Sequence, residues 1–393
     1  MLRVLTLASL FPDAARPNLG VFVERQTLGL AARADIDLRV VAPLGMPFWP
    51  LSRIARYSAL ADLPRHEDWK GLPLWRPRFL NLPGTGGRFH ARGIVRAVAP
   101  LLADMRRDFP FDVIDAEFFF PDGPAAVALG RRFGVPVSIK ARGADIHHWG
   151  RSPATGGQVL EAGRTADGLL AVSDALRRDM IALGMPGERI AVHRTGVDAE
   201  RFAPGDRAAL KAMLGIAGPL VLSVGALIPR KGHGVVIDAI ARLPGTTLLI
   251  AGEGPERTAL EARIAAAGLQ DSVLLLGSVA HADLPRLFAA ADVMALASES
   301  EGLANAWVEA LSSGTPIVVT AAGGAAETVD RPAAGRIVPR TPEAFAQAIA
   351  DLLLAPPPAE AVRAAATRFS WQANTDQLHA HLARLVEGRQ SSG

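Results

Sequence analysis

Residues 220–252 read LVLSVGALIPRKGHGVVIDAIARLPGTTLLIAG. Two apolar runs of six residues, Leu220–Gly225 and Thr247–Gly252, each end in glycine and enclose a helical pattern from about residue 232 to 242. Short apolar runs that alternate with helices are typical of βαβ units, whose parallel sheet is covered on both faces. This stretch therefore predicts a doubly wound α/β sheet.

The same alternation continues through the rest of the second half and recurs, less regularly, in the first half. Further strands are predicted at 273–277, 292–297, 316–320 and 335–339, with helices at 256–267, 283–290 and 304–313. In the first half, strands are predicted at 4–10, 38–43, 113–116, 137–140 and 168–173, with helices at 23–33, 124–133 and 174–183. We expect two doubly wound domains facing each other across a cleft, with ligands outside the carboxyl ends of their strands.

The segment RFAPGDRAALKAMLGIAGP, residues 201–219, carries proline and glycine near both ends. Turn-forming residues between two periodic regions predict a linker. We therefore expect an N-terminal domain over residues 1–200 and a C-terminal domain over residues 201–369.

The composition excludes several classes of protein. The 393 residues include no cysteine, so disulfides, thiolate nucleophiles and cysteine-bound metals are excluded. A net charge of +3 gives no indication of a nucleic-acid partner. No apolar run reaches the ~18 residues of a transmembrane helix, and a buried first strand explains the apolar residues 1–11 better than a signal peptide does. A cytoplasmic location is the simplest expectation.

Three segments at predicted carboxyl ends of strands carry groups suited to phosphate. GALIPRKG, residues 225–232, contains the adjacent cations Arg230 and Lys231; GEGP, residues 252–255, is a tight turn; SESEGLANAWVE, residues 298–309, leads into a helix. A helix N-terminus offers free N–H groups and a positive dipole end to an anion, and two cations can complete a diphosphate site. Such a site would stabilise the charge that a departing diphosphate gains.

Glu301 and Glu309 lie eight residues apart in the third segment. If the whole segment were helical, they would be about 12 Å apart, which is too far to share a proton. The spacing suits two carboxylates that hold hydroxyls at opposite ends of a nucleotide sugar. A solvated charge pair or a simple turn explains each feature taken singly, but their coincidence at one sheet edge favours a site.

Together these motifs resemble glycosyltransferase family 4, the group 1 retaining glycosyltransferases, which have two Rossmann-like domains in the GT-B fold. The family's two glutamates with seven residues between them are similar to Glu301 and Glu309. Its Arg/Lys phosphate pair is similar to Arg230 and Lys231, and its glycine turn to GEGP.

The first half and the C-terminus extend this resemblance over nearly the whole chain. The similar segments are PNLGVF (17–22), VIDAEFFFPDG (113–123), IKARGADI (139–146), VSDALRRDM (172–180), RTGVDAERF (194–202) and RFSWQANTDQL (368–378). The last resembles the family's final helix. The resemblance therefore implies that helix 370–393 packs back on the N-terminal domain, which is the acceptor side.

The resemblance implies transfer of a sugar from a UDP- or GDP-linked donor to a glycan or polyprenol-linked acceptor, with retention at the anomeric carbon. It implies a role in cell-surface polysaccharide or glycolipid biosynthesis, with no metal and no cofactor. Arg230 and Lys231 would hold the diphosphate, Glu301 would contact the donor sugar, and Arg142 would lie near the reacting centre. The implied donor-binding residues are Gly20, Gly225, Gly252, Glu253, Gly254, Glu309 at the ribose, and the backbone N–H groups of Gly302, Leu303, Ala304 and Asn305.

The sequence departs from the family pattern at three positions. Arg142 and Glu117 stand where the family commonly has histidines, and Thr195 replaces a frequent asparagine. A guanidinium can stabilise phosphate, but it cannot act as a neutral hydrogen-bond partner as imidazole can. An altered or inactive homologue is therefore one alternative. Others are a nucleotide-sugar epimerase of the same fold and a two-domain binding protein without chemistry. A dinucleotide oxidoreductase is disfavoured because GEGPER lacks the third glycine of G-x-G-x-x-G.

Residues 45–100 contain nine basic and three acidic residues, a net +6, and three of the six tryptophans: Trp49, Trp69 and Trp75. Mixed basic and aromatic surfaces bind anionic lipid headgroups. One hypothesis is peripheral attachment to the inner face of the cytoplasmic membrane, with contributions from Arg53, Arg56, Arg76 and Arg78. The alternative is that these tryptophans belong to the core and the arginines form a solvated face.

Overall fold

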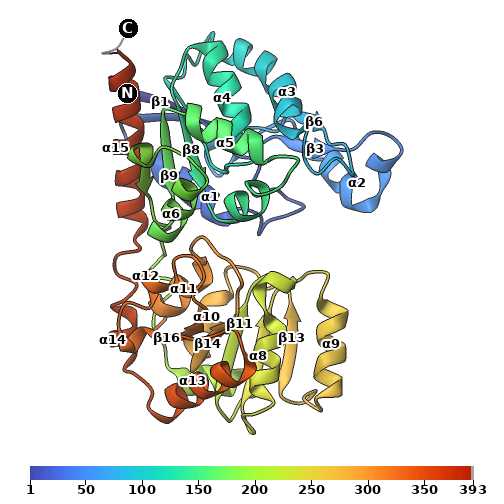
Figure 1. Cartoon of the computed structure of the whole chain (residues 1–393), viewed down its shortest axis with the longest axis vertical. Helices are drawn as coiled ribbons and strands as arrows, with labels where there is room; N and C mark the ends of the chain where they lie inside the picture. Colours follow the sequence, from blue (N-terminus) through green and yellow to red (C-terminus); the bar gives the residue numbers. More distant parts are fainter. Residues whose placement is uncertain (391–393) are drawn as a thin grey trace. The chain divides into compact units, whose positions relative to one another are not determined.

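The computed structural model describes residues 1–390, apart from the side chains of Arg53, Ala55, Arg56 and Gln390. The chain divides into two compact units. Unit 1 contains Met1–Gly196 and the C-terminal segment from Trp371, and unit 2 contains Val197–Ser370. Each unit is built on a mainly parallel sheet with helices on both faces (Figure 1).

Unit 2 has six parallel strands in the order β13-β12-β11-β14-β15-β16. In chain order this is 3-2-1-4-5-6, so the strand order reverses between β11 and β14, where ligands of doubly wound sheets bind. The strands are β11 (Leu220–Val224), β12 (Thr247–Ala251), β13 (Val273–Gly277), β14 (Val293–Leu296), β15 (Ile317–Val319) and β16 (Gly335–Ile337).

The helices of unit 2 cover both faces of this sheet, which explains why its strands read as continuous apolar runs. They are α7 (Arg207–Met213), α8 (His233–Ile240), α9 (Arg257–Ala266), α10 (Leu284–Ala290), α11 (Asn305–Ser312), α12 (Ala325–Thr328), α13 (Pro342–Leu354) and α14 (Ala359–Arg363). α8 and α13 pack together on one face, and Ile237 and Phe345 join Val221 of β11 in the core. The predicted strands of this half are confirmed, with ends that differ by at most two residues.

The expectation of a linker at residues 201–219 is wrong, because this segment is part of unit 2. The Phe202 side chain is buried there. Asp206 caps α7 by accepting a hydrogen bond from the backbone N–H of Ala209, and Lys211 lies 2.6 Å from Asp292. The proline and glycine residues therefore shape a packed segment.

Unit 1 has eight strands in the order β10-β9-β8-β7-β1-β2-β5-β4, all parallel to their neighbours except β4, which runs antiparallel to β5. A separate parallel ribbon joins β3 (Leu44–Met46) and β6 (Arg78–Leu80). The eight strands are β1 (Leu2–Leu7), β2 (Ile36–Val41), β4 (His66–Trp69), β5 (Leu72–Trp75), β7 (Val113–Ala116), β8 (Val137–Ala141), β9 (Gly168–Ala171) and β10 (Ile190–Val192).

The helices of unit 1 include several that the sequence analysis did not predict. They are α1 (Val21–Ala31), α2 (Ala55–Ala61), α3 (His90–Met105), α4 (Asp122–Phe133), α5 (Gly156–Thr165), α6 (Asp174–Ala182) and α15 (Trp371–Gln390). The ribbon β3–β6, the hairpin β4–β5 and helices α2, α3 and α5 were not predicted. β4 reads HEDW, which has none of the apolar alternation that marks a strand.

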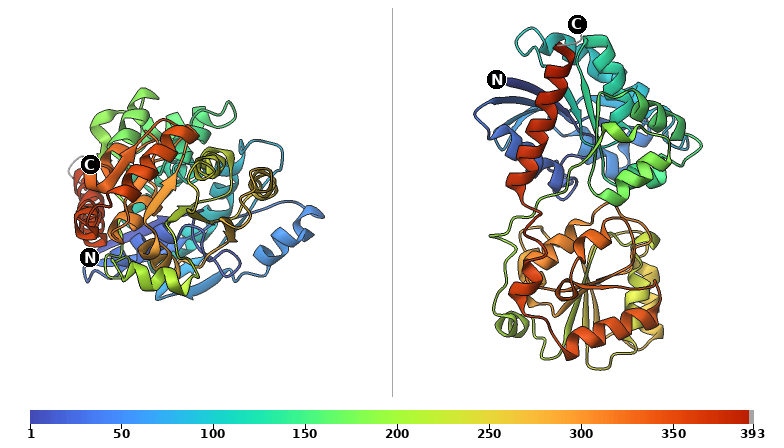
Figure 2. Two further views of the ribbon diagram at one scale, coloured as in Figure 1. Left: turned by 90° about the horizontal axis from the view of Figure 1, so that it is seen from below. Right: turned by 60° about the vertical axis from the view of Figure 1, so that its left-hand side comes forward.

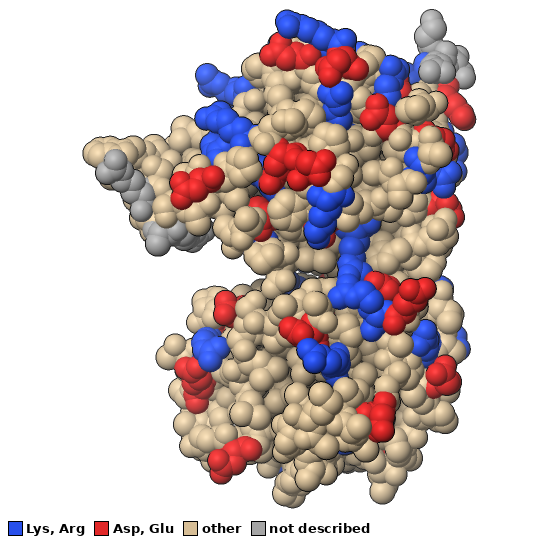
Figure 3. Space-filling model, turned by 180° about the vertical axis from the view of Figure 1, so that it is seen from behind, with Lys and Arg blue, Asp and Glu red and all other residues tan. Residues whose placement is uncertain are grey.

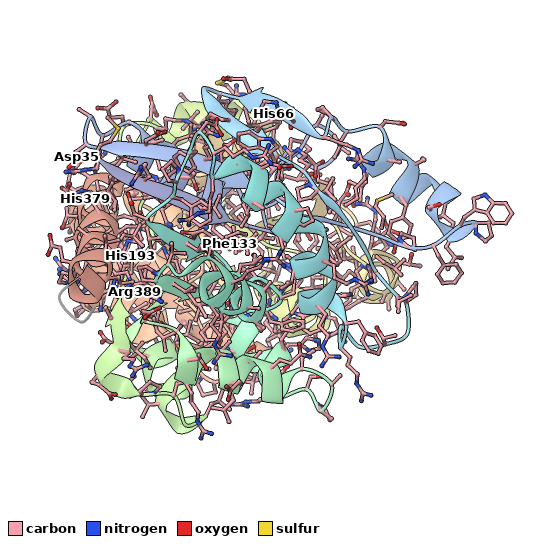
Figure 4. All side chains as sticks on the ribbon, turned by 90° about the horizontal axis from the view of Figure 1, so that it is seen from above. Asp35, His66, Phe133, His193, His379 and Arg389 are labelled. Carbon is pink, nitrogen blue, oxygen red and sulfur yellow. The ribbon has the colours of Figure 1, made fainter. Side chains whose placement is uncertain are left out.

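α15 lies along unit 1, far in sequence from the rest of it (Figure 2). It packs on α1, and Leu378 and Leu382 join Val4 and Val40 in the core of unit 1. His379 of α15 lies beside Asp35, with 3.0 Å between Nε2 and the carboxylate (Figure 4). The C-terminal helix is therefore a structural part of the first unit.

Charged side chains of both signs are interspersed on the face drawn in Figure 3. Among the described residues, no helix is both long enough and apolar enough to cross a bilayer.

Candidate active site

Two loops meet at the switch point of unit 2. The loop after β11 and the loop after β14 are joined by a hydrogen bond from the backbone N–H of Glu299 to the carbonyl oxygen of Arg230, at 2.8 Å. Gly232, with φ 69°, caps α8, and a Cβ atom there would lie 2.1 Å from the carbonyl oxygen of Ala297. Only glycine permits this approach, and it brings Arg230 and Lys231 to the chain that carries Glu301.

Glu301 is held by both predicted cations. Lys231 Nζ lies 2.5 Å from Glu301 Oε1, and Arg230 Nη1 lies 3.6 Å from Oε2. The Ser298 hydroxyl donates to Oε1 at 2.7 Å, and Arg230 also donates to the carbonyl of Ser300. The Glu301 side chain is 8% exposed, whereas Arg230 is 33% exposed. The buried carboxylate is thus paired with both cations, and the Arg230 guanidinium remains partly exposed to solvent.

The backbone between Glu301 and α11 is irregular, so the helical estimate of about 12 Å for the two glutamates does not apply. α11 begins only at Asn305. Among the described residues, no backbone carbonyl accepts a hydrogen bond from the N–H groups of Leu303, Ala304 or Asn305. Free N–H groups at a helix start, next to two cations, form an arrangement that binds anions.

Glu309 lies in α11 and contacts a residue that the sequence analysis missed. Its Oε1 lies 2.9 Å from His281 Nε2. His281 follows β13, and its ring packs edge-on against Phe202, with 5.4 Å between ring centroids. Because His281 belongs to no motif and lies 28 residues from Glu309, only the fold brings the two together.

The GEGP turn packs against the first loop. Gly252 has φ 157°, and a Cβ atom there would lie 1.9 Å from the carbonyl oxygen of Gly225. The Glu253 carboxylate accepts a hydrogen bond from the backbone N–H of Ser278 at 3.3 Å, which ties the turn to the loop after β13. Gly254 lies in the same turn, where a Cβ atom would meet the carbonyl of Leu227 at 2.3 Å. The turn therefore fixes the loop that carries Arg230 and Lys231.

His233, the first residue of α8, is a second residue that the sequence analysis missed. Its side chain is fully buried, and its Nδ1 lies 3.0 Å from the Ser223 hydroxyl of β11. Burial lowers the pKa of His233 to about 4, so the imidazole directly behind the cationic loop is neutral near pH 7.

Arg142 and Glu117, the two charged departures from the family pattern, bind each other in unit 1. They follow the adjacent strands β8 and β7. Arg142 Nε donates to the backbone carbonyl of Glu117 at 2.7 Å, and its Nη2 pairs with the Glu117 carboxylate. The guanidinium also stacks over Phe22 of α1, 4.7 Å from the ring centroid. The two replacements therefore neutralise each other.

A buried chain of polar groups continues from this pair. The Gln26 amide donates to the Glu117 carboxylate and accepts from Lys140 Nζ. Burial lowers the pKa of Lys140 to about 7 and raises the pKa of the neighbouring Asp115 well above its ordinary value. Burial alone would raise the pKa of Glu117, but Arg142 and Lys140 hold it below its ordinary value. Gly20, at the start of α1, lies in the same unit, with φ 69°.

Two of the four arginines that the membrane hypothesis invoked are structural. Arg76 is fully buried and binds Glu67 and the carbonyl of Pro12, and Arg78 donates to carbonyl groups around Leu63. Arg53 and Arg56 lie outside the described side chains. Trp69 and Trp75 are half-buried, with Trp69 donating to Glu24 at 2.5 Å. The net charge of residues 45–100 therefore overstates the positive charge that these arginines offer to a membrane.

Among the described residues, no cluster of histidine, aspartate and glutamate side chains could hold a metal ion.

Comparison with known proteins agrees with this geometry. The model of the group 1 glycosyl transferases matches residues 209–369, and that of glycosyltransferase family 4 matches residues 21–201. The two matches together span both units, and the chain is a group 1 glycosyltransferase of the family 4 type. Both family models describe glycosyltransferases, so the comparisons do not favour the epimerase or the binding protein.

Two curated relatives are similar in sequence. The protein named "Putative teichuronic acid biosynthesis glycosyltransferase TuaC" of Bacillus subtilis strain 168 is 27% identical over 360 residues, which are 88% of each chain. The D-inositol 3-phosphate glycosyltransferase of Mycolicibacterium paratuberculosis is 36% identical over 236 residues. That second match spans 56% of this chain and only about half, 53%, of the relative.

Solved structures show the GT-B fold. Sucrose-phosphate synthase from Thermosynechococcus elongatus superposes with a TM-score of 0.82 at 19% identity, covering 99% of this chain and all of that one. HepE of Anabaena, solved in complex with UDP, superposes with a TM-score of 0.75 at 22% identity, covering 98% of this chain and all of that one.

Proposed function

We propose that this chain transfers a sugar from a nucleotide sugar to an acceptor, with retention at the anomeric carbon and without a metal ion. The observation that carries the proposal is the cluster of Arg230, Lys231 and Glu301 at the switch point of unit 2, beside the free N–H groups that precede α11. Cations and oriented N–H groups at one place are what a departing diphosphate needs.

The groups would act as follows. Arg230 and Lys231 stabilise the charge that develops on the diphosphate, so that cationic side chains do the work of a divalent metal. Glu301, oriented by Lys231 and Ser298, accepts hydrogen bonds from sugar hydroxyls. Glu309, oriented by His281, accepts hydrogen bonds from the ribose. No carboxylate among the described residues is identifiable as a covalent nucleophile, and we therefore favour front-face displacement, in which the leaving diphosphate takes the acceptor proton.

A UDP-linked donor has the best support, since HepE has been solved with UDP and with UDP-glucose. The name of the TuaC relative points to a cell-surface polysaccharide pathway and hence to a glycan or lipid-linked acceptor. We also propose a cytoplasmic enzyme that works at the inner face of the membrane. In unit 1, Arg142, paired with Glu117, would lie near the reacting centre as a positioning residue, and Gly20 would let the loop before α1 approach the donor.

A thermal-shift panel of UDP, GDP, ADP and TDP and their glucose derivatives tests the donor site. A ligand that binds only the folded state raises the midpoint by mass action. We expect one nucleotide, with UDP favoured, to raise it in the wild type and to have a much smaller effect in Lys231→Ala. If no nucleotide stabilises the protein, the proposal is wrong.

Product analysis tests the remaining parts. Proton NMR of the product should show the anomeric configuration of the donor, and inversion would refute retention. Activity should survive EDTA treatment, and its loss, restored by added Mg²⁺ or Mn²⁺, would refute metal independence.

A further inference from the structure

Unit 1 contains a pocket of about 610 Å³, and of its lining residues only Pro121 belongs to a segment that carries the family resemblance. One wall is the switch point of the sheet of unit 1, where Ser9 follows β1 and Pro121 follows β7. The opposite wall is formed by the ribbon β3–β6 and by α2. A crevice outside the carboxyl ends of parallel strands, at the point where their order reverses, is where this fold class binds ligands.

The lining of the pocket is mostly apolar and offers no unpaired charge. Leu44, Leu60, Phe79, Tyr57 and two prolines are among its lining residues. The Arg16 guanidinium lies 2.6 Å from the Asp13 carboxylate, and the Asn81 side chain is bound to His90 at 2.8 Å. Arg16 is the one charged lining residue, whereas the apolar side chains that make up most of the lining suit the apolar part of an amphiphile.

An exposed apolar rim surrounds the same elements. Phe48, Trp49, Ile54, Leu80 and Phe89 lie on or next to β3, α2, β6 and the start of α3, and this set is called the rim below. Trp49 is 70% exposed, and the other four are between 41% and 52% exposed. The rim contains every exposed large aromatic side chain among the described residues, namely Phe48, Trp49 and Phe89, and two exposed aliphatic side chains. In Figure 1, α2 projects from unit 1 next to β3 and β6. Apolar side chains gathered in this way mark an interaction surface.

A row of arginines borders the rim. Arg88, Arg92 and Arg96 are exposed. Arg92 and Arg96 are four residues apart and share one face of the first turns of α3, and Arg88 lies in the turn just before this helix. None of the ion pairs among the described residues involves them. α3 packs on β6: a Cβ atom on Gly93 would lie 3.4 Å from the carbonyl oxygen of Leu80. The rim and the arginine row are therefore continuous, and apolar groups bordered by unpaired positive charge complement the surface of an anionic bilayer.

We propose that the rim and the arginine row dock unit 1 on an anionic bilayer, and that the pocket beneath them receives an amphiphilic, lipid-anchored acceptor. The inference deepens the glycosyl transfer proposed above and rests on it. It replaces the buried Arg76 and paired Arg78 of the sequence hypothesis with side chains that are free to meet lipid.

Vesicle flotation tests the docking surface. We expect the wild type to bind vesicles of phosphatidylcholine mixed with phosphatidylglycerol, and to bind pure phosphatidylcholine vesicles much less. Phe48→Ser/Trp49→Ser and the triple variant Arg88→Gln/Arg92→Gln/Arg96→Gln should each bind about tenfold more weakly or worse.

Unit 2 provides matched controls. Leu354→Ser and Met213→Ser change apolar side chains that are 88% and 73% exposed, and Arg257→Gln/Arg263→Gln/Arg286→Gln removes three arginines. These variants should bind as the wild type does. If the wild type binds neither vesicle, or if the rim and control variants lose binding equally, the docking surface is refuted.

Fluorescence identifies the residue that enters the bilayer. Brominated phospholipids in the mixed vesicles should quench part of the tryptophan emission of the wild type, and Trp49→Phe should remove that quenching. Quenching that persists unchanged in Trp49→Phe would place another tryptophan in the lipid and refute the assigned face.

A bulky substitution that fills the pocket tests the acceptor site. Ala59 is exposed and lines the pocket, so Ala59→Trp should block it without disturbing the core. We expect vesicle binding and nucleotide stabilisation to be unchanged. Transfer of sugar to lipids that butanol extracts from bacterial membranes should fall about tenfold or more. Ala265→Trp, on exposed α9, is the control.

Two outcomes separate this inference from the proposed function. If Ala59→Trp transfers as well as the wild type, or if only water-soluble acceptors are labelled, the lipid-acceptor pocket is refuted while the donor chemistry stands. If no nucleotide stabilises unit 2, the proposed function fails whatever the vesicles show.

Discussion

The two units share a doubly wound sheet but place their charged groups differently. In unit 2 the charges lie in loops at the switch point, and Arg230 is one-third exposed beside the buried Glu301. In unit 1 the charges at the carboxyl ends of β7 and β8 are buried: Glu117, after β7, is 1% exposed, and Lys140, within β8, is completely buried. Partly exposed charge can exchange an internal partner for a ligand, whereas a buried pair mainly holds the fold in one arrangement. The comparison assigns anion binding to unit 2 and positioning to the network of unit 1.

Breaking the buried network should produce the largest effect. Glu117→Gln leaves the buried Arg142 guanidinium without its carboxylate partner, and removing one member of a buried pair costs about 3–5 kcal/mol of unfolding free energy. Denaturation of unit 1 measures the loss. Nucleotide stabilisation of unit 2 should remain, and Glu117→Gln/Arg142→Gln should recover part of the loss. A Glu117→Gln protein as stable as the wild type would contradict the comparison.

A pH series distinguishes Asp122 of unit 1 from His233 of unit 2 by the sign of their contributions to stability. Burial, with Glu117 and Asp145 nearby, raises the pKa of Asp122 in unit 1 from 3.8 to about 7. Its contribution to stability is therefore complete below pH 4 and is lost as the pH rises toward 7. His233 in unit 2, with its pKa lowered from 6.5 to about 4, contributes above pH 6.5 and loses that stability as the pH falls toward 4.

These effects amount to roughly 4 kcal/mol for Asp122 and roughly 3 kcal/mol for His233. Hydrogen exchange, corrected for intrinsic rates, reads the stability of each unit separately. Asp122→Asn should remove a loss of stability between pH 4 and 7 from unit 1 only, and His233→Asn should remove a gain between pH 4 and 6.5 from unit 2 only. A variant whose pH response equals that of the wild type would show that the substituted group does not contribute.

Substituting Lys231 or Glu309 in the candidate active site of unit 2 should lower turnover without unfolding the protein. Lys231→Ala removes a phosphate partner and leaves Glu301 with only Arg230 and Ser298, so we expect turnover to fall about 100-fold. Glu309→Ala should lower turnover at least tenfold, with circular dichroism unchanged. Arg257→Ala, which breaks an exposed pair with Glu261 in the same unit, is the control. Rates like those of the wild type in both site variants would refute the site.

The smallest effect tests His281 as a positioning residue for Glu309. We expect His281→Ala to weaken UDP binding about threefold, as is typical of the loss of one hydrogen bond. Because His281 would act through the ribose contact of Glu309, the variant should bind 2′-deoxy-UDP as well as the wild type does. An equal loss for both nucleotides would mean that His281 acts elsewhere.

Unit 2 could be predicted from the sequence more completely than unit 1. Its strands and helices have regular lengths, and its site motifs follow directly after strands. In unit 1, the region from β3 to α3 escaped prediction, because strands such as HEDW have no apolar period and α3 carries Pro100 inside it. The proline and glycine residues at 201–219 suggested a linker, but a buried Phe202 and the Lys211–Asp292 pair place that segment in unit 2.

The sequence by itself determined the fold class, the family and the segments that carry Arg230, Lys231, Glu301 and Glu309, because alternating apolar runs and short motifs are local properties. Only the tertiary structure decided which side chains meet: Lys231 with Glu301, His281 with Glu309, and the two departures Glu117 and Arg142 with each other. Such pairs depend on strand order, which parallel crossovers leave open in the sequence. The structure also decided which arginines and tryptophans of residues 45–100 face solvent, because burial follows from packing and not from composition.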